Sequence, residues 1–470
     1  LSMDATLANK FFCVNFVKNL HLDFSEEIPE LTKSCYAKGN YVYRLDGLLL
    51  YNNKKETFID YIATDKTLSF IKEYLKDKPI TLNSPEILYA PAESGMKFRL
   101  LSDETEEEQA WNKKAASFSK KPLKNQVLFV SPRADGHLEG NAKALYPFIK
   151  GKKTICAKRL PHNPQTALEM TEAILTSKVI VTDDYVKYLR YFPLRPEQRV
   201  IQLWHACGAF KKFGRSTAEL KFGSSAATLD KYPNYGNLTH VTVSSPEVIW
   251  AYEEAMHLPK GIVKATGVSR TDQFYDKEFV ESRKQKLYEI MPEAKDKKVI
   301  LYAPTFRGHV ATASSPDRID FERFCRELGN EYVIVCKHHP FVKNPPIIPE
   351  ELQHFARDLT KYLSIEDLLC CADICISDYS SLVFEYSLFE KPMIFYAYDY
   401  DNYCDWRGFY YDYSEFTPGP VVQTEDELLN SIKNIDTQFD KQKVIDFKEK
   451  FMGSCDGHAT ERIIALMKEN

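Results

Sequence analysis

The sequence predicts an α/β protein with two consecutive doubly wound, parallel-sheet domains. From residue 126 onward, short β-rich runs alternate with helix-length segments, and the same rhythm restarts at residue 297. This alternation is typical of βαβ units. Several runs end in Gly, Ser, Asp or Asn, and ligands of such folds bind beyond the carboxyl ends of the strands. Two domains facing each other would therefore enclose a cleft lined by these polar ends.

The N-terminal part of the chain has a different texture. Residues 1 to about 120 alternate short apolar stretches with polar turns, then end in the acidic run DETEEEQ and the lysine-rich KKAASFSKKPLKN. Charged runs of this kind are typical of linkers. We therefore expect an N-terminal accessory region at 1–122, which could bind acceptor, membrane or a partner subunit. Its role and the oligomeric state stay open.

Ten strands are predicted after the linker. Those of the first domain, 123–290, cover residues 126–133, 153–160, 177–184, 199–206, 240–246 and 262–269. Those of the second domain, 291–445, cover residues 297–306, 332–340, 373–381 and 392–399. The C-terminal segment, 446–470, reads as helices interrupted between Gly453 and Gly457 that pack back across the domains.

Composition excludes several classes of protein. The net charge of −4 gives no global basic field for nucleic acid, although a local basic patch could attract an anionic membrane or polymer. The 11 cysteines lack paired CxxC spacing, and CCADIC at 370–375 lies in an apolar run, so we predict core cysteines in a reducing compartment and no metal site. The sequence has neither a signal-peptide pattern nor about 18 uninterrupted apolar residues, so we expect no span across a membrane.

The run RVIQLWHACGAFKKFGRST places His205 at a strand end. A histidine there can act as general base for an alcohol, because its ordinary pKa of about 6.5 is close to neutral pH. It can equally be a hydrogen-bonded structural residue beside Trp204, and position alone favours neither reading. Lys211, Lys212 and Arg215 follow, either as a solvated face or as a local anion trap on the acceptor side.

Two further cations and a histidine pair close strands of the second domain. Arg307 follows LYAPTF, where a guanidinium can hold two phosphate oxygens, although a surface arginine is the plainer reading. Lys337, His338 and His339 precede Pro340 at the end of YVIVC. Adjacent side chains on an extended backbone point to opposite sides, so we expect one histidine to face the cleft.

A strand, an SDYSS turn and an apolar helix follow at 373–389. Amides of Ser380 and Ser381 at a helix N-terminus would favour a phosphate, whereas Asp378 or Ser380 could simply cap that helix. Glu385, one turn further, could accept hydrogen bonds from nucleotide hydroxyls, or be solvated or paired. Arg407 lies in YDYDNYCDWRGFYYDY, whose aromatics fit packing between domains as well as ligand stacking.

Together these motifs resemble the CDP-glycerol glycerophosphotransferase family, which makes teichoic-acid and capsule-type polymers of bacterial cell walls. The resemblance covers residues 198 to 465 and consists of seven motifs in order: the Trp-His strand end with KKFG, then ATGVSRTDQF, LYAPTFRG, KHHP, SDYSSLVFEYSLFEKPMIFY, WRGFYYDYSEFTPGP and GSCDGHATERI. It implies the GT-B fold of two doubly wound domains. It also implies an enzyme that transfers glycerol phosphate or a related polyol phosphate from a CDP-polyol to an acceptor hydroxyl, releasing CMP.

The resemblance also implies roles for individual residues. His205 would be the catalytic base and His339 the second functional histidine, on the donor side. Arg307, Lys337, Ser380, Ser381 and Arg407 would hold the donor phosphates, and Glu385 would lie near the nucleotide. No cofactor is expected besides the CDP-polyol substrate. The acceptor would be lipid-linked or polymeric, and the enzyme would be cytoplasmic and peripheral on the inner face of the cell membrane.

Two rival functions remain. A glycosyltransferase using a nucleotide-sugar could have the same two-domain scaffold, because a fold does not by itself define an activity. A non-catalytic binding module of a polymer-synthesis complex could retain the motifs without turnover. The sequence does not distinguish glycerol from ribitol, or a primase from a polymerase.

Overall fold

The computed structural model of the chain describes most of its C-terminal three quarters. It describes residues 113–468 except 160–163, 187–188, 190–193, 219, 221–228, 230–234, 309–312, 317 and 401–407, and six short strands before residue 113. The chain divides into two compact units, one formed by Leu1–Ser117 with Phe222–Lys231 and the other by Phe118–Lys221 with Tyr232–Asn470. The predicted functional residues belong to the second unit.

The N-terminal unit contains two small sheets. In one sheet the strand order is β1–β6–β5–β4, formed by Val42–Arg44, Lys97–Arg99, Ile87–Tyr89 and Thr81–Ser84. The other is the antiparallel pair of β2 (Leu48–Asn52) and β3 (Thr57–Tyr61).

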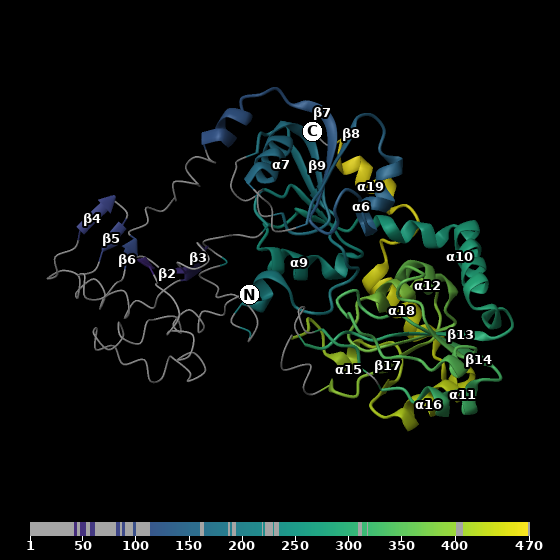
Figure 1. Ribbon diagram of the computed structural model, residues 1–470. Helices are drawn as coiled ribbons and strands as arrows, with labels where there is room; N and C mark the ends of the chain where they lie inside the picture. Colours follow the sequence, from purple (N-terminus) through teal and green to yellow (C-terminus); the bar gives the residue numbers. More distant parts are fainter. Residues whose placement is uncertain are drawn as a thin grey trace. The chain divides into compact units, whose positions relative to one another are not determined.

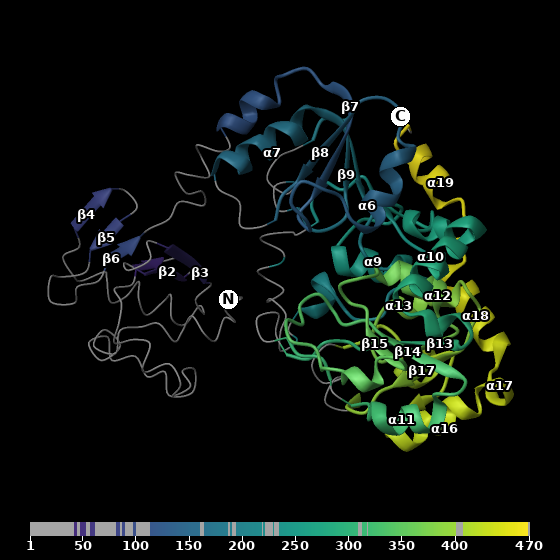
Figure 2. The same ribbon diagram turned by 45° about the vertical axis from the view of Figure 1, so that its right-hand side comes forward.

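The first lobe of the second unit is built on a six-stranded parallel sheet of order β12–β11–β10–β9–β7–β8 (Figure 1). Its strands are β7 (Lys124–Ser131), β8 (Lys153–Ala157), β9 (Ser177–Thr182), β10 (Arg199–Gln202), β11 (His240–Thr242) and β12 (Val263–Lys264). Helix α6 (Gly140–Leu145) packs on one face and α7 (Pro164–Thr176) on the other (Figure 2), with α9 (Ile249–Met256) between β11 and β12 in the chain. The strand order reverses between β7 and β9, which is where doubly wound sheets bind ligands.

The second lobe has a six-stranded parallel sheet of order β15–β14–β13–β16–β17–β18. Its strands are β13 (Lys298–Ala303), β14 (Tyr332–Cys336), β15 (Ala356–Asp358), β16 (Ile374–Ser377), β17 (Met393–Tyr396) and β18 (Val421–Val422). Its helices are α10 (Lys277–Ile290), α11 (Phe321–Leu328), α12 (Ile365–Cys371), α13 (Leu382–Ser387), α15 (Tyr413–Phe416), α16 (Glu425–Lys433) and α17 (Ile435–Gln438). Here the order reverses between β13 and β16.

Short 3-10 helices complete the second unit. They are η3 (Tyr146–Phe148), η5 (Gly214–Thr217), η6 (Pro246–Val248), η7 (Ser269–Tyr275), η8 (Pro292–Lys295) and η10 (Glu350–Leu352).

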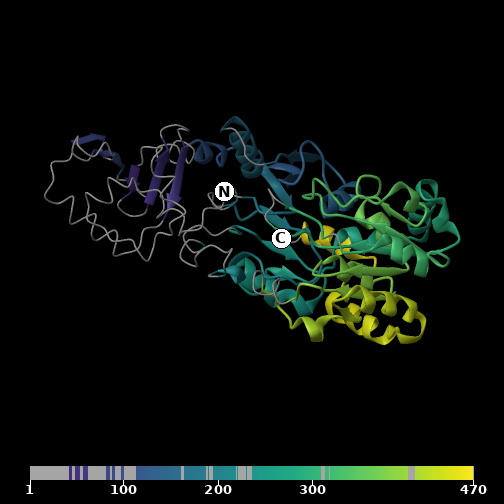
Figure 3. The same ribbon diagram turned by 60° about the horizontal axis from the view of Figure 1, so that its bottom comes forward.

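The last two helices connect the second lobe back to the first. Helix α18 (Lys441–Met452) packs on α13, and its Phe447 stacks on Phe384 with ring centroids 5.3 Å apart. Helix α19 (Ala459–Leu466) then places Ile463 and Leu466 in the core formed by β7, β9 and β10. Figure 3 shows these yellow helices at the end of the chain. Both lobes therefore depend on residues from the last 30 positions.

The ten strands predicted from the sequence are confirmed, and the structure adds β15 and β18. These two have three and two residues and lie in none of the β-rich runs from which strands were predicted. Each is an edge strand of the second sheet. The cysteines predicted to lie in the core are also confirmed, because Cys370, Cys371 and Cys375 are each at most 4% exposed.

Candidate active site

His205 lies just beyond β10, on a strained segment of backbone. Trp204 adopts φ 55°, a left-handed conformation that is unfavourable for a bulky side chain. Two buried amides stabilise it: Gln202 Oε1 accepts from the Trp204 amide at 2.9 Å, and Asn141 Nδ2 donates to the Trp204 carbonyl at 2.8 Å. The indole is 4.3 Å from the imidazole of His205, between ring centroids. The backbone conformation of this turn therefore sets the direction of the His205 side chain.

The imidazole of His205 faces a carboxylate. Its Nδ1 lies 3.5 Å from Asp184 Oδ2, which also accepts a hydrogen bond from Arg133 at 3.2 Å. Burial lowers the pKa of His205, and the Asp184 charge opposes this effect. The ring is therefore neutral at pH 7. Its Nδ1 makes no hydrogen bond with the described residues, and a proton on Nδ1 would face the Asp184 carboxylate and leave Nε2 as the basic nitrogen. This arrangement suits a general base.

A second carboxylate, Asp183, lies at the reversal point of the same sheet. It is 1% exposed and accepts a hydrogen bond from Ser131 at 3.0 Å, while its Oδ1 has no partner among the described residues. Burial raises the pKa of Asp183 to about 6, against the lowering effect of the Ser131 hydroxyl. The carboxyl ends of β7 and β9 thus meet beside the His205 turn.

The SDYSS turn lies at the reversal point of the second sheet. Asp378 Oδ1 accepts hydrogen bonds from the amides of Thr305 at 2.8 Å and Tyr379 at 2.7 Å. Asp378 therefore joins the ends of β13 and β16, and it does not cap α13 as its sequence position suggested. Ser381 is the N-cap residue of α13 but makes no side-chain cap bond.

Ser380 and Ser381 are half-buried at this turn. Within the described part of the chain, their backbone amides donate to no protein acceptor. Amides in that state at the end of a parallel strand are suitable donors to a phosphate. The geometry is compatible with the predicted phosphate contact, which stays a prediction.

The guanidinium of Arg307 is paired with carboxylates of the protein. Its guanidinium donates to Asp399 Oδ2 at 2.6 Å, to Asp399 Oδ1 at 2.9 Å and to Asp378 Oδ2 at 2.9 Å. Its charge is thus balanced internally, which does not support the predicted direct hold on the donor phosphates. In the structure Arg307 orients the SDYSS turn through Asp378.

Lys337 also differs from its predicted role. Its ammonium donates to the carbonyls of Thr360 at 2.9 Å and Leu363 at 2.6 Å. Burial lowers the pKa of Lys337. These contacts connect the end of β14 to the loop after β15 and do not support the predicted phosphate contact.

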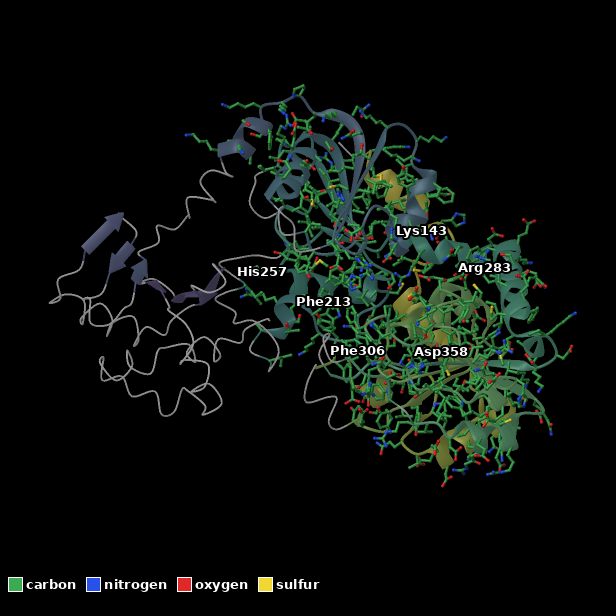
Figure 4. All side chains as sticks on the ribbon, in the orientation of Figure 1. Lys143, Phe213, His257, Arg283, Phe306 and Asp358 are labelled. Atoms are coloured by element: carbon green, nitrogen blue, oxygen red, sulfur yellow. The ribbon has the colours of Figure 1, made fainter. Side chains whose placement is uncertain are left out.

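The two adjacent histidines separate as an extended backbone requires. His338 is 4% exposed, forms a 2.7 Å hydrogen bond with Ser315 and lines a small cavity with Tyr302 and Arg318. His339 is half-buried, and its ring centroid lies 4.7 Å from that of Phe306, which is labelled in Figure 4. Its Nδ1 accepts from the Phe341 amide at 3.2 Å, so Nε2 carries the proton. His339 is thus the more accessible of the two, and its role at the donor site stays a prediction.

Glu385 is buried and paired, unlike a residue that contacts a nucleotide. It is 4% exposed, and its Oε1 accepts from Arg270 Nε at 2.7 Å. Arg270 Nη1 in turn donates to the His205 carbonyl at 2.9 Å. A chain of contacts therefore runs from α13 in the second lobe to His205 in the first.

The acceptor-side cations lie in the loop after β10. The amide of Lys212 donates to the Gly408 carbonyl at 3.1 Å, and Lys211 forms an isolated antiparallel bridge with Phe409. Arg215 lies in η5, the 3-10 helix that follows. Phe213, labelled in Figure 4, stacks on Trp204 with ring centroids 4.9 Å apart. The loop thus joins the His205 turn to the second lobe. Arg407 lies outside the described residues.

The structure brings most predicted residues into two neighbouring groups. One is formed by His205 and the Lys211–Arg215 loop, and the other by Arg307, His339, Ser380 and Ser381. Sequence reasoning missed Asp183, Asp184, Asp399 and Arg270. The first three close predicted strands and Arg270 directly follows the predicted strand 262–269, so their strand-end positions were an available signal.

The described residues lack two further kinds of feature. No group of three His, Cys, Asp or Glu side chains there could hold a metal ion. No helix in that part of the chain is both long and apolar enough to cross a membrane.

The fold and site define a class of protein: two doubly wound lobes of GT-B type with polar strand ends in both. A solved structure of the wall teichoic acid polymerase TagF has this fold, with a TM-score of 0.62 and 22% identity over 76% of this chain and 93% of that chain. The predicted fold class is confirmed.

The chain belongs to the family described as CDP-Glycerol:Poly(glycerophosphate) glycerophosphotransferase, whose model matches residues 113–469. This membership confirms the predicted family and the predicted class of enzyme, a CDP-glycerol glycerophosphotransferase-type phosphotransferase.

Two curated relatives illustrate the range of the family. The teichoic acid ribitol-phosphate polymerase TarK of Staphylococcus aureus is 32% identical over 93% of this chain and 87% of its own length. The teichoic acid poly(ribitol-phosphate) polymerase of Bacillus spizizenii is 41% identical over 63% of this chain, but the match spans 47% of that relative.

Proposed function

We propose that this chain transfers a polyol phosphate from a CDP-polyol to a hydroxyl of a polymeric or lipid-linked acceptor, releasing CMP, in teichoic-acid-type polymer synthesis. One observation carries the proposal. A neutral histidine at the end of β10 is connected through Arg270 and Glu385 to the helix that follows the SDYSS amides. A base candidate and a phosphate-site candidate thus come from the carboxyl ends of two facing sheets.

The reaction is an in-line phosphoryl transfer. The acceptor hydroxyl gives its proton to Nε2 of His205 while its oxygen forms a bond to the phosphorus that carries the polyol. The bond between that phosphorus and the bridging oxygen breaks, and CMP leaves with the electron pair. Catalysis of this kind consists mostly of positioning and of donors directed at the phosphoryl oxygens. Ser380, Ser381 and His339 are the proposed donors, and no cofactor enters the proposal.

For the polyol we propose ribitol. TarK and the Bacillus spizizenii polymerase are both named for ribitol phosphate, as is a Bacillus spizizenii ribitol-phosphate primase that is 36% identical over 73% of this chain. Relatives named for glycerol phosphate also match, at 28 to 36% identity. A variant of TagF was solved after a soak with CDPG, so CDP-ribitol and CDP-glycerol must be compared directly.

A panel of donor substrates tests both the class of reaction and the identity of the polyol. CDP-ribitol, CDP-glycerol and a set of UDP-sugars are incubated with the protein and a polyol-phosphate primer, and nucleotide release and product mass are measured. We expect CMP release from CDP-ribitol. Turnover of CDP-glycerol alone would correct the polyol, and turnover of UDP-sugars alone would replace the proposal by a glycosyltransferase.

The role of His205 is tested with His205→Ala. We expect CMP release to fall by about 10²- to 10⁴-fold, the usual contribution of a general base. The control is His137→Ala, whose exposed side chain contacts Glu139 in the first lobe. A folded His205→Ala protein with an unchanged rate would contradict the proposed mechanism. Localisation at the inner face of the cell membrane stays a prediction.

A further inference from the structure

The ion pair between Arg270 and Glu385 joins the two lobes beside the His205 turn. Arg270 lies in η7 of the first lobe and Glu385 in α13 of the second, and their side chains are 11% and 6% exposed. The Nε–Oε1 distance is 2.7 Å. Both charges are thus removed from water and satisfied mainly by each other.

This pair is poorly explained by stability. Removing two charges from water offsets most of what their attraction contributes, so a buried ion pair is weak evidence for a stabilising role. Aromatic side chains already connect the two lobes here, since Phe384 of α13 packs against Phe210 in the loop after β10, and Phe274 of η7 lies 5.2 Å from Phe389 between ring centroids. A role in positioning accounts better for the placement of these two charges.

What the pair positions is the backbone of His205. Arg270 Nη1 donates to the His205 carbonyl at 2.9 Å, and Asn141 Nδ2 donates to the preceding carbonyl, of Trp204, at 2.8 Å. Ser269 completes this arrangement by donating to the Asn141 carbonyl at 2.8 Å. The strained turn is thus held by buried donors on consecutive carbonyls, and one of those donors is fixed by Glu385.

We infer that Glu385 is a positioning residue for His205, acting through Arg270, and makes no contact with the nucleotide. The inference rests on the proposed function. It follows that α13 serves the site twice: the turn before it presents the Ser380 and Ser381 amides, and its Glu385, one turn later, fixes the base. The positions of the donor site and the base are thereby fixed relative to each other, although the two belong to different lobes.

Glu385→Gln separates this role from nucleotide binding. The substitution keeps an oxygen that can accept from Arg270 and removes only the charge. The kcat for CMP release and the Kd for CMP, the latter by calorimetry, are measured on the full chain. We expect kcat to fall about 10- to 100-fold, because a small displacement of a catalytic group has effects of that size, with the Kd within about twofold of wild type. Arg270→Lys keeps the charge but cannot donate to Glu385 and to the His205 carbonyl with the fixed geometry of a guanidinium. It should likewise lower kcat and leave the Kd for CMP unchanged.

Asp436→Asn is the control. It removes the carboxylate charge of the exposed Lys298–Asp436 pair in the same lobe and should leave kcat and the Kd for CMP unchanged. A weaker CMP affinity with unchanged kcat would show that Glu385 contacts the nucleotide, and no change in either would also overturn the inference. If circular dichroism shows that Glu385→Gln is unfolded, Glu385→Asp decides the question by the same criteria. Failure of wild-type protein to release CMP would instead refute the proposed function.

Discussion

The imidazole of His205 is subject to two opposing influences. Burial beside Trp204 disfavours the charged ring, as do the nearby charges of Arg133 and Arg270, whereas the carboxylate of Asp184, 3.5 Å from Nδ1, favours it. The net effect is a pKa below the ordinary value of about 6.5. The ring therefore stays neutral, and able to accept a proton, below the pH at which an exposed histidine becomes charged.

This balance predicts the pH dependence of the reaction. Activity is lost when His205 is protonated, so the acid limb of kcat should have its midpoint below pH 6.5. In Asp184→Asn the charge that raises the pKa is absent, so the midpoint should move to still lower pH. We also expect kcat at pH 8 to fall about 10- to 100-fold, because Nδ1 loses its charged partner. The measurement is CMP release from pH 4.5 to 9.

Glu172→Gln is the matched control, because it removes an exposed carboxylate paired with Lys121 in the same lobe. Its pH profile should equal that of wild type. A midpoint that rises in Asp184→Asn would mean that the carboxylate does not act on His205 as the geometry indicates.

At the scale of elements, the loop after β10 is shaped by its contact with α13. Gly208 has φ 63°, and a Cβ at this position would overlap the ring of Phe384. Its amide donates to Ser244 at 3.0 Å, and the Tyr252 hydroxyl donates to its carbonyl at 3.0 Å. The ACGAF segment therefore requires glycine at this position for two independent reasons, conformation and space.

Gly208→Ala should consequently lower the free energy of unfolding by about 2–5 kcal/mol, the sum of a left-handed backbone penalty and overpacking. Urea denaturation measures it. Gly136→Ala is the control, since Gly136 has φ 76° with nothing within 4 Å of the added carbon, and it should show the backbone penalty alone, about 1–2 kcal/mol. Equal losses in the two variants would show that Phe384 moves aside without cost.

At the scale of the whole molecule, the second unit is connected by its C-terminal helices. Ser244 donates to the Phe451 carbonyl at 2.7 Å, and the Ser454 amide donates to the Ser244 carbonyl at 3.0 Å. Asp272 then accepts from the first amides of α19, those of Ala459 at 3.0 Å and Thr460 at 2.7 Å. The end of the chain is thus fixed to the first lobe by both hydrogen bonds and core packing.

Truncation of Ile463 tests how much the first lobe depends on α19. Its side chain is fully buried in the core of β7, β9 and β10, so Ile463→Ala should lower the free energy of unfolding by about 2–5 kcal/mol. Ile464→Ala removes the same atoms from a partly buried neighbour and should have a smaller effect. Equal, small losses would indicate that α19 is not integral to the first core. Thermal and urea unfolding of both variants provide the comparison.

The sequence by itself determined the strands, the class of fold and the positions of the strand ends. Hydrophobic runs such as 177–182 and 298–303 are local signals, and the polar residues after them mark where a parallel sheet binds ligands. His205, His339, Ser380 and Ser381 are candidate site residues for this reason. The motifs also sufficed to identify the family.

Only the tertiary structure decided how the charged groups are paired. Arg307 meets Asp378 because β13 and β16 are neighbours, and Arg270 meets Glu385 because two lobes converge, although 115 positions separate these two in the sequence. Pairing depends on strand order and on lobe packing, which local patterns do not encode. The contacts of Arg307, Lys337 and Glu385 have the same physical reason: a buried charge takes the nearest partner that removes its desolvation cost.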